Sequence, residues 1–149
     1  MTLFEELMGL VDELDKARVE YALVGGLAVA VWGAPRATKD IDLLVRPDAL
    51  ERAMEAAARR GADVRAIPMT FRDGMQLQRV TRADGTALLT IDFIIVNDNL
   101  ETTWSSRQQL ATSGRTLWVI SRDALIAMKA LAARPQDIGD IEKLRDLDR

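Results

Sequence analysis

The chain has 149 residues, a formal net charge of −3, 48% hydrophobic residues and 29% charged residues, the balance of a soluble globular protein. It contains no cysteine and no histidine. Disulfides, thiolate zinc sites, cysteine nucleophiles and a histidine general base are therefore excluded, and any bound metal must be a hard ion held by oxygen ligands. No stretch approaches the roughly 20 apolar residues of a membrane helix, and Glu5 and Glu6 stand where an export signal would be basic. We expect a cytoplasmic protein that is not bound to a membrane.

Helices and strands are expected to alternate in the first half of the chain. The patterns predict, in order, a helix over residues 2–18, a strand at 21–24, a glycine turn at 25–26, a buried helix over 27–32, a strand at 40–45, a helix over 47–60 and a short strand at 62–67. Thr2 and Glu5 have the spacing of a capping box at the start of the first helix. Gly33 and Gly61 stand where two of these helices are expected to end.

The second half of the chain is expected to begin with a hairpin and to end in helices. The patterns predict strands at 75–81 and 86–96 joined by a turn at 82–85, a helix over 99–110, a strand at 116–120, a helix over 121–133 and a last helix from Pro135 to the end. Ser121 is the expected cap of the helix that follows it. The last helix is expected to bury Ile138, Ile141 and Leu144.

These elements predict the fold class and the domain organisation. Strands that alternate with helices are typical of an α/β protein, here with a mixed β-sheet flanked by helices. The sequence contains no linker-like segment that would divide the chain, so we expect one domain over residues 1–149. From about residue 121 onward, the expected elements make a helical carboxyl-terminal part.

Three aspartates lie within predicted strands. Successive side chains of a strand point to opposite faces, so Asp40 and Asp42 should emerge on the same side of their strand. Asp92 lies inside the apolar run 88–96, where a lone carboxylate is costly to bury without a partner. If the two strands are neighbours, the three carboxylates converge on one face of the sheet.

Clustered carboxylates indicate a cation. The two strands offer no lysine or arginine at these positions, so the simplest neutralising partner is one or two divalent ions, Mg²⁺ or Mn²⁺, with oxygen ligands. Two such ions clamp the attacking and leaving oxygens of a displacement at phosphorus, which indicates phosphoryl transfer. Gly25 and Gly26, between a strand and a helix, would expose amide groups to a phosphate tail. Taken singly, alternate aspartates can be an exposed edge and a glycine pair a tight turn, but their combination favours a metal site.

The same residues resemble a known superfamily. The order of a glycine pair, polar residues at alternate positions, an acidic strand and a distant aspartate is similar to the nucleotidyltransferases related to DNA polymerase beta; it is carried by Gly25, Gly26, Arg36, Thr38, Asp40, Asp42 and Asp92. Within that superfamily the chain most resembles the minimal nucleotidyltransferases of bacterial abortive-infection and type IV toxin-antitoxin systems. Their helical motif is similar to residues 125–129 and to the series Arg134, Asp137, Asp140 and Ile141.

The resemblance implies roles for particular residues. Asp40 and Asp42 would hold both metal ions, and Asp92 would complete the second metal site and help to orient the acceptor hydroxyl. The residues expected to bind the nucleotide are Gly25, Gly26, Arg36, Thr38, Lys39, Lys129 and Asp137. Gln136 stands where related sequences often have a lysine, which leaves Lys129 and Arg134 as the cations expected beside the triphosphate.

Two of these helical positions also have a simpler interpretation. Lys129 lies between Met128 and Leu131 and can be a surface lysine whose stem packs along an apolar helix. Asp137 and Asp140 can simply favour the start of the last helix through its dipole. Burial and ion pairing of these side chains distinguish the two interpretations.

The expected activity is metal-dependent transfer of a nucleoside monophosphate from an NTP to a hydroxyl, with loss of pyrophosphate. The acceptor is expected to be an RNA such as tRNA, a protein or a small molecule, and the resemblance implies a cognate toxin or antitoxin partner. An RNA acceptor would need a local basic patch, and the arginines expected to form it are Arg59, Arg60, Arg65, Arg72 and Arg79. Scattered arginines would instead favour a protein or small-molecule acceptor. The alternatives are a catalytically weak, antitoxin-like partner module and a nucleotide-binding sensor, and retention of all three aspartates favours the enzyme.

Overall fold

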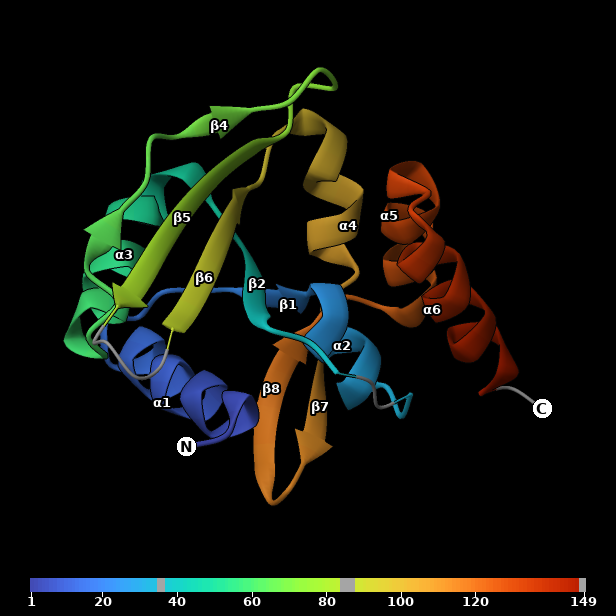
Figure 1. The fold of residues 1–149 in the computed structure, drawn as a ribbon, viewed down its shortest axis with the longest axis horizontal. Coiled ribbons are helices and arrows are strands. Elements are labelled where there is room, and N and C mark those ends of the chain that lie inside the picture. The colour runs from blue at the N-terminus through green and yellow to red at the C-terminus, as the bar shows by residue number, and fades with distance from the viewer. Residues whose placement is uncertain (35–36, 84–87, 148–149) are drawn as a thin grey trace.

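A mixed β-sheet flanked by helices forms the protein (Figure 1). The structure, a computed structural model, describes residues 1–34, 37–83 and 88–147. The strands are β1 (Ala22–Val24), β2 (Asp40–Val45), β3 (Val64–Arg65), β4 (Met69–Thr70), β5 (Gln76–Ala83), β6 (Leu88–Ile95), β7 (Gln108–Thr112) and β8 (Arg115–Val119). The helices are α1 (Leu3–Lys16), α2 (Gly25–Val31), α3 (Leu50–Arg59), α4 (Glu101–Ser105), α5 (Arg122–Ala132) and α6 (Pro135–Asp146), with short 3-10 helices η1 (Pro47–Ala49) and η2 (Asp98–Leu100). None of the helices described is long and apolar enough to cross a membrane.

The strand order places β2 at the centre of the sheet. In the described part of the chain the sheet has eight strands in the order β3-β5-β6-β2-β1-β8-β7, and β4 also pairs with β5. β2 runs parallel to β6 and antiparallel to β1, while β1 runs parallel to β8. The hairpins β5–β6 and β7–β8 are antiparallel. The mixed sheet flanked by helices that the sequence predicts is therefore confirmed.

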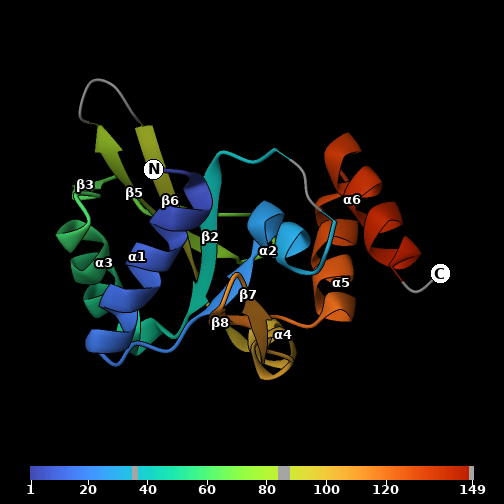
Figure 2. The ribbon, with the colours of Figure 1, turned by 90° about the horizontal axis from the view of Figure 1, so that it is seen from below.

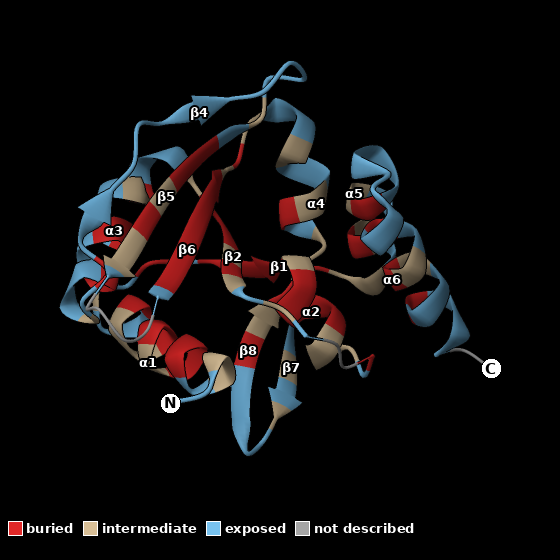
Figure 3. Ribbon diagram, in the orientation of Figure 1, coloured by how far each residue is buried: buried red, intermediate tan, exposed pale blue. Residues whose placement is uncertain are grey.

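The central strands carry the core (Figure 3). Ile41 and Leu43 of β2 and Ile91 and Phe93 of β6 are fully buried. α1 and α3 lie side by side and contact β2 and β6, respectively (Figure 2). Because side chains alternate along a strand, the pleat that buries these apolar residues turns the aspartates of the same strands to the opposite face.

The predicted helix caps are confirmed. The Glu5 amide donates to Thr2 Oγ1 at 3.1 Å and the Thr2 amide donates to Glu5 Oε1 at 3.0 Å, which makes a complete capping box. Ser121 Oγ accepts a hydrogen bond from the Ala124 amide at 3.0 Å and so caps α5. Gly61 follows the end of α3 with a φ of +87°, a conformation that favours glycine.

The helix predicted over residues 99–110 is wrong in its carboxyl-terminal part. The end of η2 and the whole of α4 are helical, and the segment then continues as β7, which forms a hairpin with β8. Ser113 and Gly114 at the hairpin turn have φ angles of +50° and +76°. Positive φ at both central positions is what a two-residue turn of type I′ requires, so the Ser-Gly pair carried a signal for this hairpin.

Smaller differences concern β4 and the hairpin turn at 82–85. β4 pairs with the edge of β5 and was not predicted. Residues 82 and 83 of the predicted turn belong to β5, while residues 84 and 85 lie outside the described residues. Both β3 and β4 are exposed, which is why their short segments show no alternation of apolar and polar residues.

α5 and α6 form a helical hairpin, and α5 contacts α2 (Figures 1 and 2). The buried face of α6 differs from the predicted one. Ile138 is 53% exposed, whereas Asp137 and Asp140 are buried together with Leu144. The prediction for Leu144 is confirmed and that for Ile138 is wrong, because α6 turns a charged face toward α5.

Candidate active site

The register of two parallel strands brings the three aspartates together. β2 pairs with β6 so that Asp42 is the Cα partner of Asp92, and Asp40 is the Cα partner of Thr90. Side chains at paired positions point to the same face of a sheet. Asp40, Asp42 and Asp92 therefore share one face, opposite the face that builds the core against α1 and α3.

Gly25 lies directly against this acidic group. Val24 is the cross-strand partner of Asp42, and Gly25 follows it with a φ of +74°. A Cβ atom on Gly25 would lie 2.2 Å from Asp42 Oδ2, so a side chain is excluded. Gly25 and Gly26 form the first turn of α2, and the apolar side chain of Val24 offers no acceptor to their amides. The two glycines thus place backbone amide groups beside a carboxylate, with Gly25 half-buried and Gly26 buried.

Asp42 is the most perturbed carboxyl group of the site. Burial, followed by the negative charges of Asp92 and Asp40, raises the pKa of Asp42 to about 7, while the charges of Lys129 and Arg79 act in the opposite direction. A carboxylate with two carboxylate neighbours is stabilised by a nearby cation, which favours its ionised form. The electrostatics of this face therefore suit a positively charged ligand.

Asp92 forms an ion pair with Arg79 that was not predicted from the sequence. Arg79 is its cross-strand neighbour on β5, and Arg79 Nε donates to Asp92 Oδ1 at 2.8 Å while Nη2 donates to Oδ2 at 3.1 Å. The hydrogen bonds that Arg79 donates to Asp92, and the charges of Asp92, Asp40 and Asp42, raise the pKa of Arg79 above its usual range. The expectation that Asp92 needs a partner is correct. The turn predicted at 82–85 would place residue 79 opposite residue 88, whereas the observed register pairs Ala83 with Leu88 and so brings Arg79 opposite Asp92.

The helical hairpin contributes a second charged group. Lys129 is only 6% exposed, and its Nζ lies 2.9 Å from Asp140 Oδ2 and 3.5 Å from Asp137 Oδ1. Arg134 Nε donates to Asp137 Oδ2 at 2.7 Å, and the Arg134 backbone amide donates to the same oxygen at 3.1 Å. Burial alone would raise the pKa of Asp137, but the hydrogen bonds from Arg134 outweigh it and hold that pKa below its usual value.

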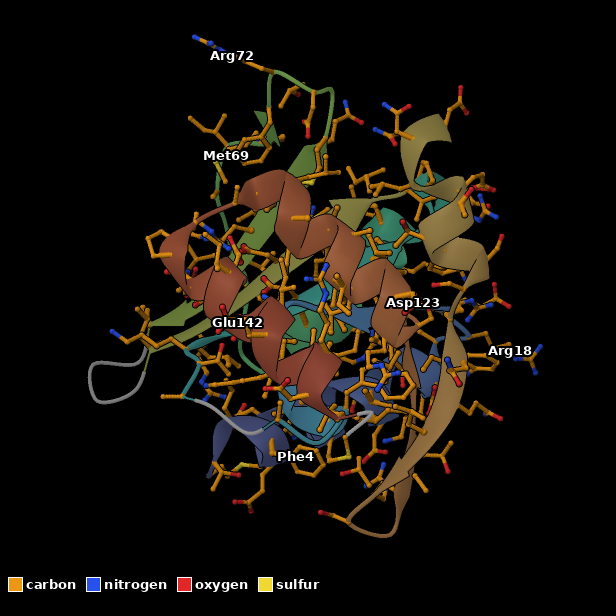
Figure 4. The ribbon with its side chains drawn as sticks, turned by 90° about the vertical axis from the view of Figure 1, so that its right-hand side faces the viewer. Phe4, Arg18, Met69, Arg72, Asp123 and Glu142 are labelled. Atoms are coloured by element: carbon orange, nitrogen blue, oxygen red, sulfur yellow. The ribbon has the colours of Figure 1, made fainter. Side chains whose placement is uncertain are left out.

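This geometry decides between the interpretations of the helical residues. Lys129 is not a surface lysine, because its ammonium group lies between two buried carboxylates. Asp137 does cap α6 through the Arg134 amide, and it also pairs with both cations. The charge of Lys129 acts on Asp42 and the charge of Asp42 acts on Arg134, so this face of the hairpin is turned toward the acidic sheet. α5 and α6 stand in front of the sheet in Figure 4.

The segment that leads into β2 holds the other predicted nucleotide-binding residues. Thr38 is half-buried and Lys39 is exposed, directly before Asp40. Arg36 lies outside the described residues. Contacts of Thr38 and Lys39 with a nucleotide stay predictions.

The carboxylates fit a hard divalent ion in part. Asp40 and Asp42 would supply oxygen ligands on one face beside Gly25, and the negative charges of Asp92 and Asp40 add to burial in raising the pKa of Asp42. Asp92 is bound by Arg79, and in the part of the chain that the structure describes no group of three acidic side chains is spaced as a formed metal site. The arrangement thus fits one ion at Asp40 and Asp42, and a second only if Asp92 becomes free.

The arginine patch predicted for an RNA acceptor is not formed. Arg59 pairs with Glu13 at 2.8 Å across α3 and α1, and Arg65 pairs with Glu51 at 2.8 Å. Arg72 projects outward at the far end of the molecule (Figure 4). Arg79 faces the carboxylates, and the guanidinium group of Arg60 lies over Gly9 of α1. The five arginines thus lie in different surroundings, and this distribution favours a protein or small-molecule acceptor.

A strand, a glycine turn, a helix and an acidic strand within a mixed sheet define the nucleotidyltransferase fold, and solved structures support this assignment. The antibiotic-resistance factor ANT(2″)-Ia, in complex with adenylyl-2″-tobramycin, superposes with a TM-score of 0.68 at 17% identity over 97% of this chain and 88% of that one. The lincosamide antibiotic adenylyltransferase LnuA with bound lincomycin gives 0.67 at 17% identity over 95% of both chains. A protein from Thermotoga maritima gives 0.62 at 16% identity over 98% and 93%. At these identities the likeness establishes the shared fold.

The family follows from the sequence itself. Residues 1–147 match the family described as "Nucleotidyltransferase of unknown function (DUF6036)", and the chain belongs to it. No match was found among curated proteins. The chain is therefore a nucleotidyltransferase, which confirms the predicted superfamily and the predicted class of enzyme.

Proposed function

We infer that the protein transfers a nucleoside monophosphate from an NTP to a hydroxyl group, and that Asp40 and Asp42 hold a divalent ion, Mg²⁺ or Mn²⁺, for this reaction. The observation that carries the proposal is the pairing of Asp42 with Asp92 in the β2–β6 register, beside the side-chain-free position of Gly25. This pairing collects carboxylates next to the backbone amides of a turn between strand and helix. In the reaction the acceptor oxygen bonds to the α-phosphorus and its proton passes to solvent, the bond from that phosphorus to the bridging oxygen breaks, and pyrophosphate leaves with the electron pair.

Several residues of the candidate site have a proposed role in this reaction. A divalent ion supplies Lewis-acid stabilisation of the charge on the transferred phosphoryl group. Gly25 and Gly26 bring their amides close to the phosphate oxygens, since neither carries a side chain. Asp92, next to Asp42, orients the acceptor hydroxyl and receives its hydrogen bond. Lys129 holds Asp137 and Asp140 in place and adds positive charge opposite the acidic sheet.

The acceptor that fits this surface best is a small hydroxyl-bearing molecule. The net charge is −3, and the arginines expected to bind an RNA are dispersed, with Arg59 and Arg65 engaged by acidic side chains. Two proteins of the same fold are seen with an adenylylated aminoglycoside and with a lincosamide, both of which are small molecules. A protein hydroxyl is the second candidate, because it needs no extended basic surface.

The test is transfer of label from each of the four NTPs, labelled at the α-phosphorus, in the presence of Mg²⁺ or Mn²⁺. Acceptors are presented separately as hydroxylated small molecules, as denatured and native protein, and as total RNA. We expect label on a small molecule, with release of one pyrophosphate per transfer, and loss of both products in Asp40→Asn. Asp63→Asn, on an exposed loop residue, is the matched control and should retain activity. Failure of the wild type to bind any NTP in the presence of either ion would contradict the proposal.

A role in a toxin-antitoxin pair rests on the resemblance of the helical motif around Lys129 and Asp137. It is tested by inducible expression in a bacterial host. Growth arrest that depends on Asp42 would support a toxin role, and normal growth under full expression would count against it. The cytoplasmic location predicted from the sequence is tested by fractionation of the same cells.

A further inference from the structure

The pair formed by Arg79 and Asp92 occupies both oxygens of the third carboxylate. Each oxygen accepts one hydrogen bond of the guanidinium fork, at 2.8 and 3.1 Å. A forked pair of this kind is among the stronger charge-assisted contacts in proteins, and it leaves few lone-pair directions for another ligand. As long as the fork is in place, Asp92 is a poor metal ligand.

The two partners of this pair differ in their freedom to move. Asp92 has a side chain that is 6% exposed and sits in the middle of β6, between β2 and β5. The side chain of Arg79 is 43% exposed and reaches the carboxylate from β5. The guanidinium of Arg79 can be hydrated when it moves into water, whereas the buried carboxylate then needs another cation as its partner. In this pair Arg79 is therefore a cation that can move, and Asp92 is an anion held in place by its strand.

We propose that Arg79 takes the place of a second metal ion, so that the resting site binds one divalent ion at Asp40 and Asp42, and Asp92 becomes a metal ligand only when Arg79 leaves it. The inference rests on the proposed function, because it presumes the first ion at Asp40 and Asp42. Arg79 and the second ion compete for the same two oxygens. Arg79 is thus a positioning residue that sets how many ions the site holds.

A purely structural pair between β5 and β6 predicts a different behaviour. In that case the removal of Arg79 would weaken the hairpin but would leave the number of bound ions unchanged. A general effect of charge makes a third prediction, since removal of any nearby arginine would tighten metal binding whether or not Asp92 keeps its carboxylate. Counting ions in single and double variants separates the three explanations.

The experiment counts bound Mn²⁺ by electron paramagnetic resonance of the free ion, without NTP. We expect the wild type to bind one Mn²⁺ and to take up a second only at a concentration at least tenfold higher. Arg79→Met, which keeps the length of the stem and removes the fork, should bind two ions with the second at least tenfold tighter than in the wild type. Arg79→Met combined with Asp92→Asn should lose that gain.

Two controls accompany these variants. Arg72→Met makes the same change of net charge at a side chain that points away from the rest of the molecule (Figure 4). This variant should bind Mn²⁺ as the wild type does. Arg79→Lys keeps a positive charge but has no fork, and it gives a second test if Arg79→Met does not fold. A gain of the second ion in Arg79→Lys as well would support competition for the two oxygens.

The outcomes separate this inference from the proposed function. Unchanged ion number and affinity in folded Arg79→Met, or a gain that persists in the double variant, would overturn the role of Arg79. Equal affinity for both ions in the wild type would overturn it as well. Absence of any Mn²⁺ binding in the wild type would instead contradict the metal site at Asp40 and Asp42.

Discussion

Removing the charge of Asp42 should stabilise the metal-free protein at neutral and alkaline pH. The carboxylate is half-buried and lies beside Asp40 and Asp92. Burial, then the charges of these two neighbours, raises its pKa to about 7. Asp42→Asn keeps the shape of the side chain and removes the negative charge that destabilises the folded state.

The magnitude follows from the pKa. A rise from the ordinary 3.8 to about 7 corresponds to about 4 kcal/mol of lost stability once Asp42 is ionised. A group whose pKa is raised by folding contributes its stability below the unfolded pKa and loses it as the pH rises through the folded pKa. The loss therefore develops between about pH 4 and pH 7. An asparagine amide without full hydrogen bonding costs about 1–3 kcal/mol, so the expected net gain above pH 7 is about 1–3 kcal/mol.

The assay is urea unfolding with a metal chelator at several values between pH 5 and pH 8. The difference in the free energy of unfolding between Asp42→Asn and the wild type should grow with pH and level off near pH 7. Asp63→Asn, at an exposed position, should show no such trend. Mg²⁺ or Mn²⁺ should stabilise the wild type, since the ion binds the folded state, and should stabilise Asp42→Asn less.

Two results would refute this reasoning. A difference between Asp42→Asn and the wild type that is independent of pH would show that Asp42 is not held at a raised pKa. An equal rise in melting temperature with Mn²⁺ in both proteins would remove Asp42 from the metal site.

Three further variants test the glycine turn, the third aspartate and the buried lysine. Gly25→Ala should cost at least about 2 kcal/mol more than Gly114→Ala in urea unfolding, because both glycines have positive φ but only the former meets a carboxylate oxygen at 2.2 Å; equal costs would contradict the clash. Asp92→Asn should keep NTP affinity within about tenfold, roughly 1.4 kcal/mol by calorimetry, while single-turnover transfer falls by orders of magnitude; transfer at the wild-type rate would exclude Asp92 from the mechanism. Lys129→Met should destabilise by about 3–5 kcal/mol because two buried carboxylates lose their shared cation, and exposed Lys143→Met should not; similar melting temperatures would argue against the buried pair.

The stretch from Tyr21 to Val45 was predictable because its signals are local. A short apolar strand, a glycine pair, an apolar helix and alternate aspartates each follow from spacing alone. Asp92 was predictable for a different reason, since a carboxylate in the middle of an apolar strand needs a special environment. What the local sequence does not contain is the pairing of β2 with β6. That pairing depends on the whole sheet. The sequence therefore predicts that the carboxylates converge only if the two strands are neighbours.

Two misjudged regions show where local patterns mislead. β7 is a short edge strand with mostly exposed residues, so its sequence shows no alternation of apolar and polar residues. The helix predicted over 99–110 therefore extends too far, into this strand. In α6 the apolar pattern selected Ile138 for the core, although the buried positions are Asp137 and Asp140. Their burial is possible because Lys129 on the neighbouring helix neutralises them, and this compensation is visible only in three dimensions.

The positions of the charges explain why the three aspartates depend on nearby cations. The aspartates are carried by β2 and β6, which are hydrogen-bonded to each other, so they cannot move apart to relieve repulsion. Relief must come from groups outside these two strands, and the structure supplies Arg79 from β5 and Lys129 from α5. Arg79 is the more exposed of the two cations, whereas Lys129 is buried between its own carboxylates. An incoming metal ion therefore displaces Arg79 more readily than Lys129, and the arginine is the group through which ion binding at this face is adjusted.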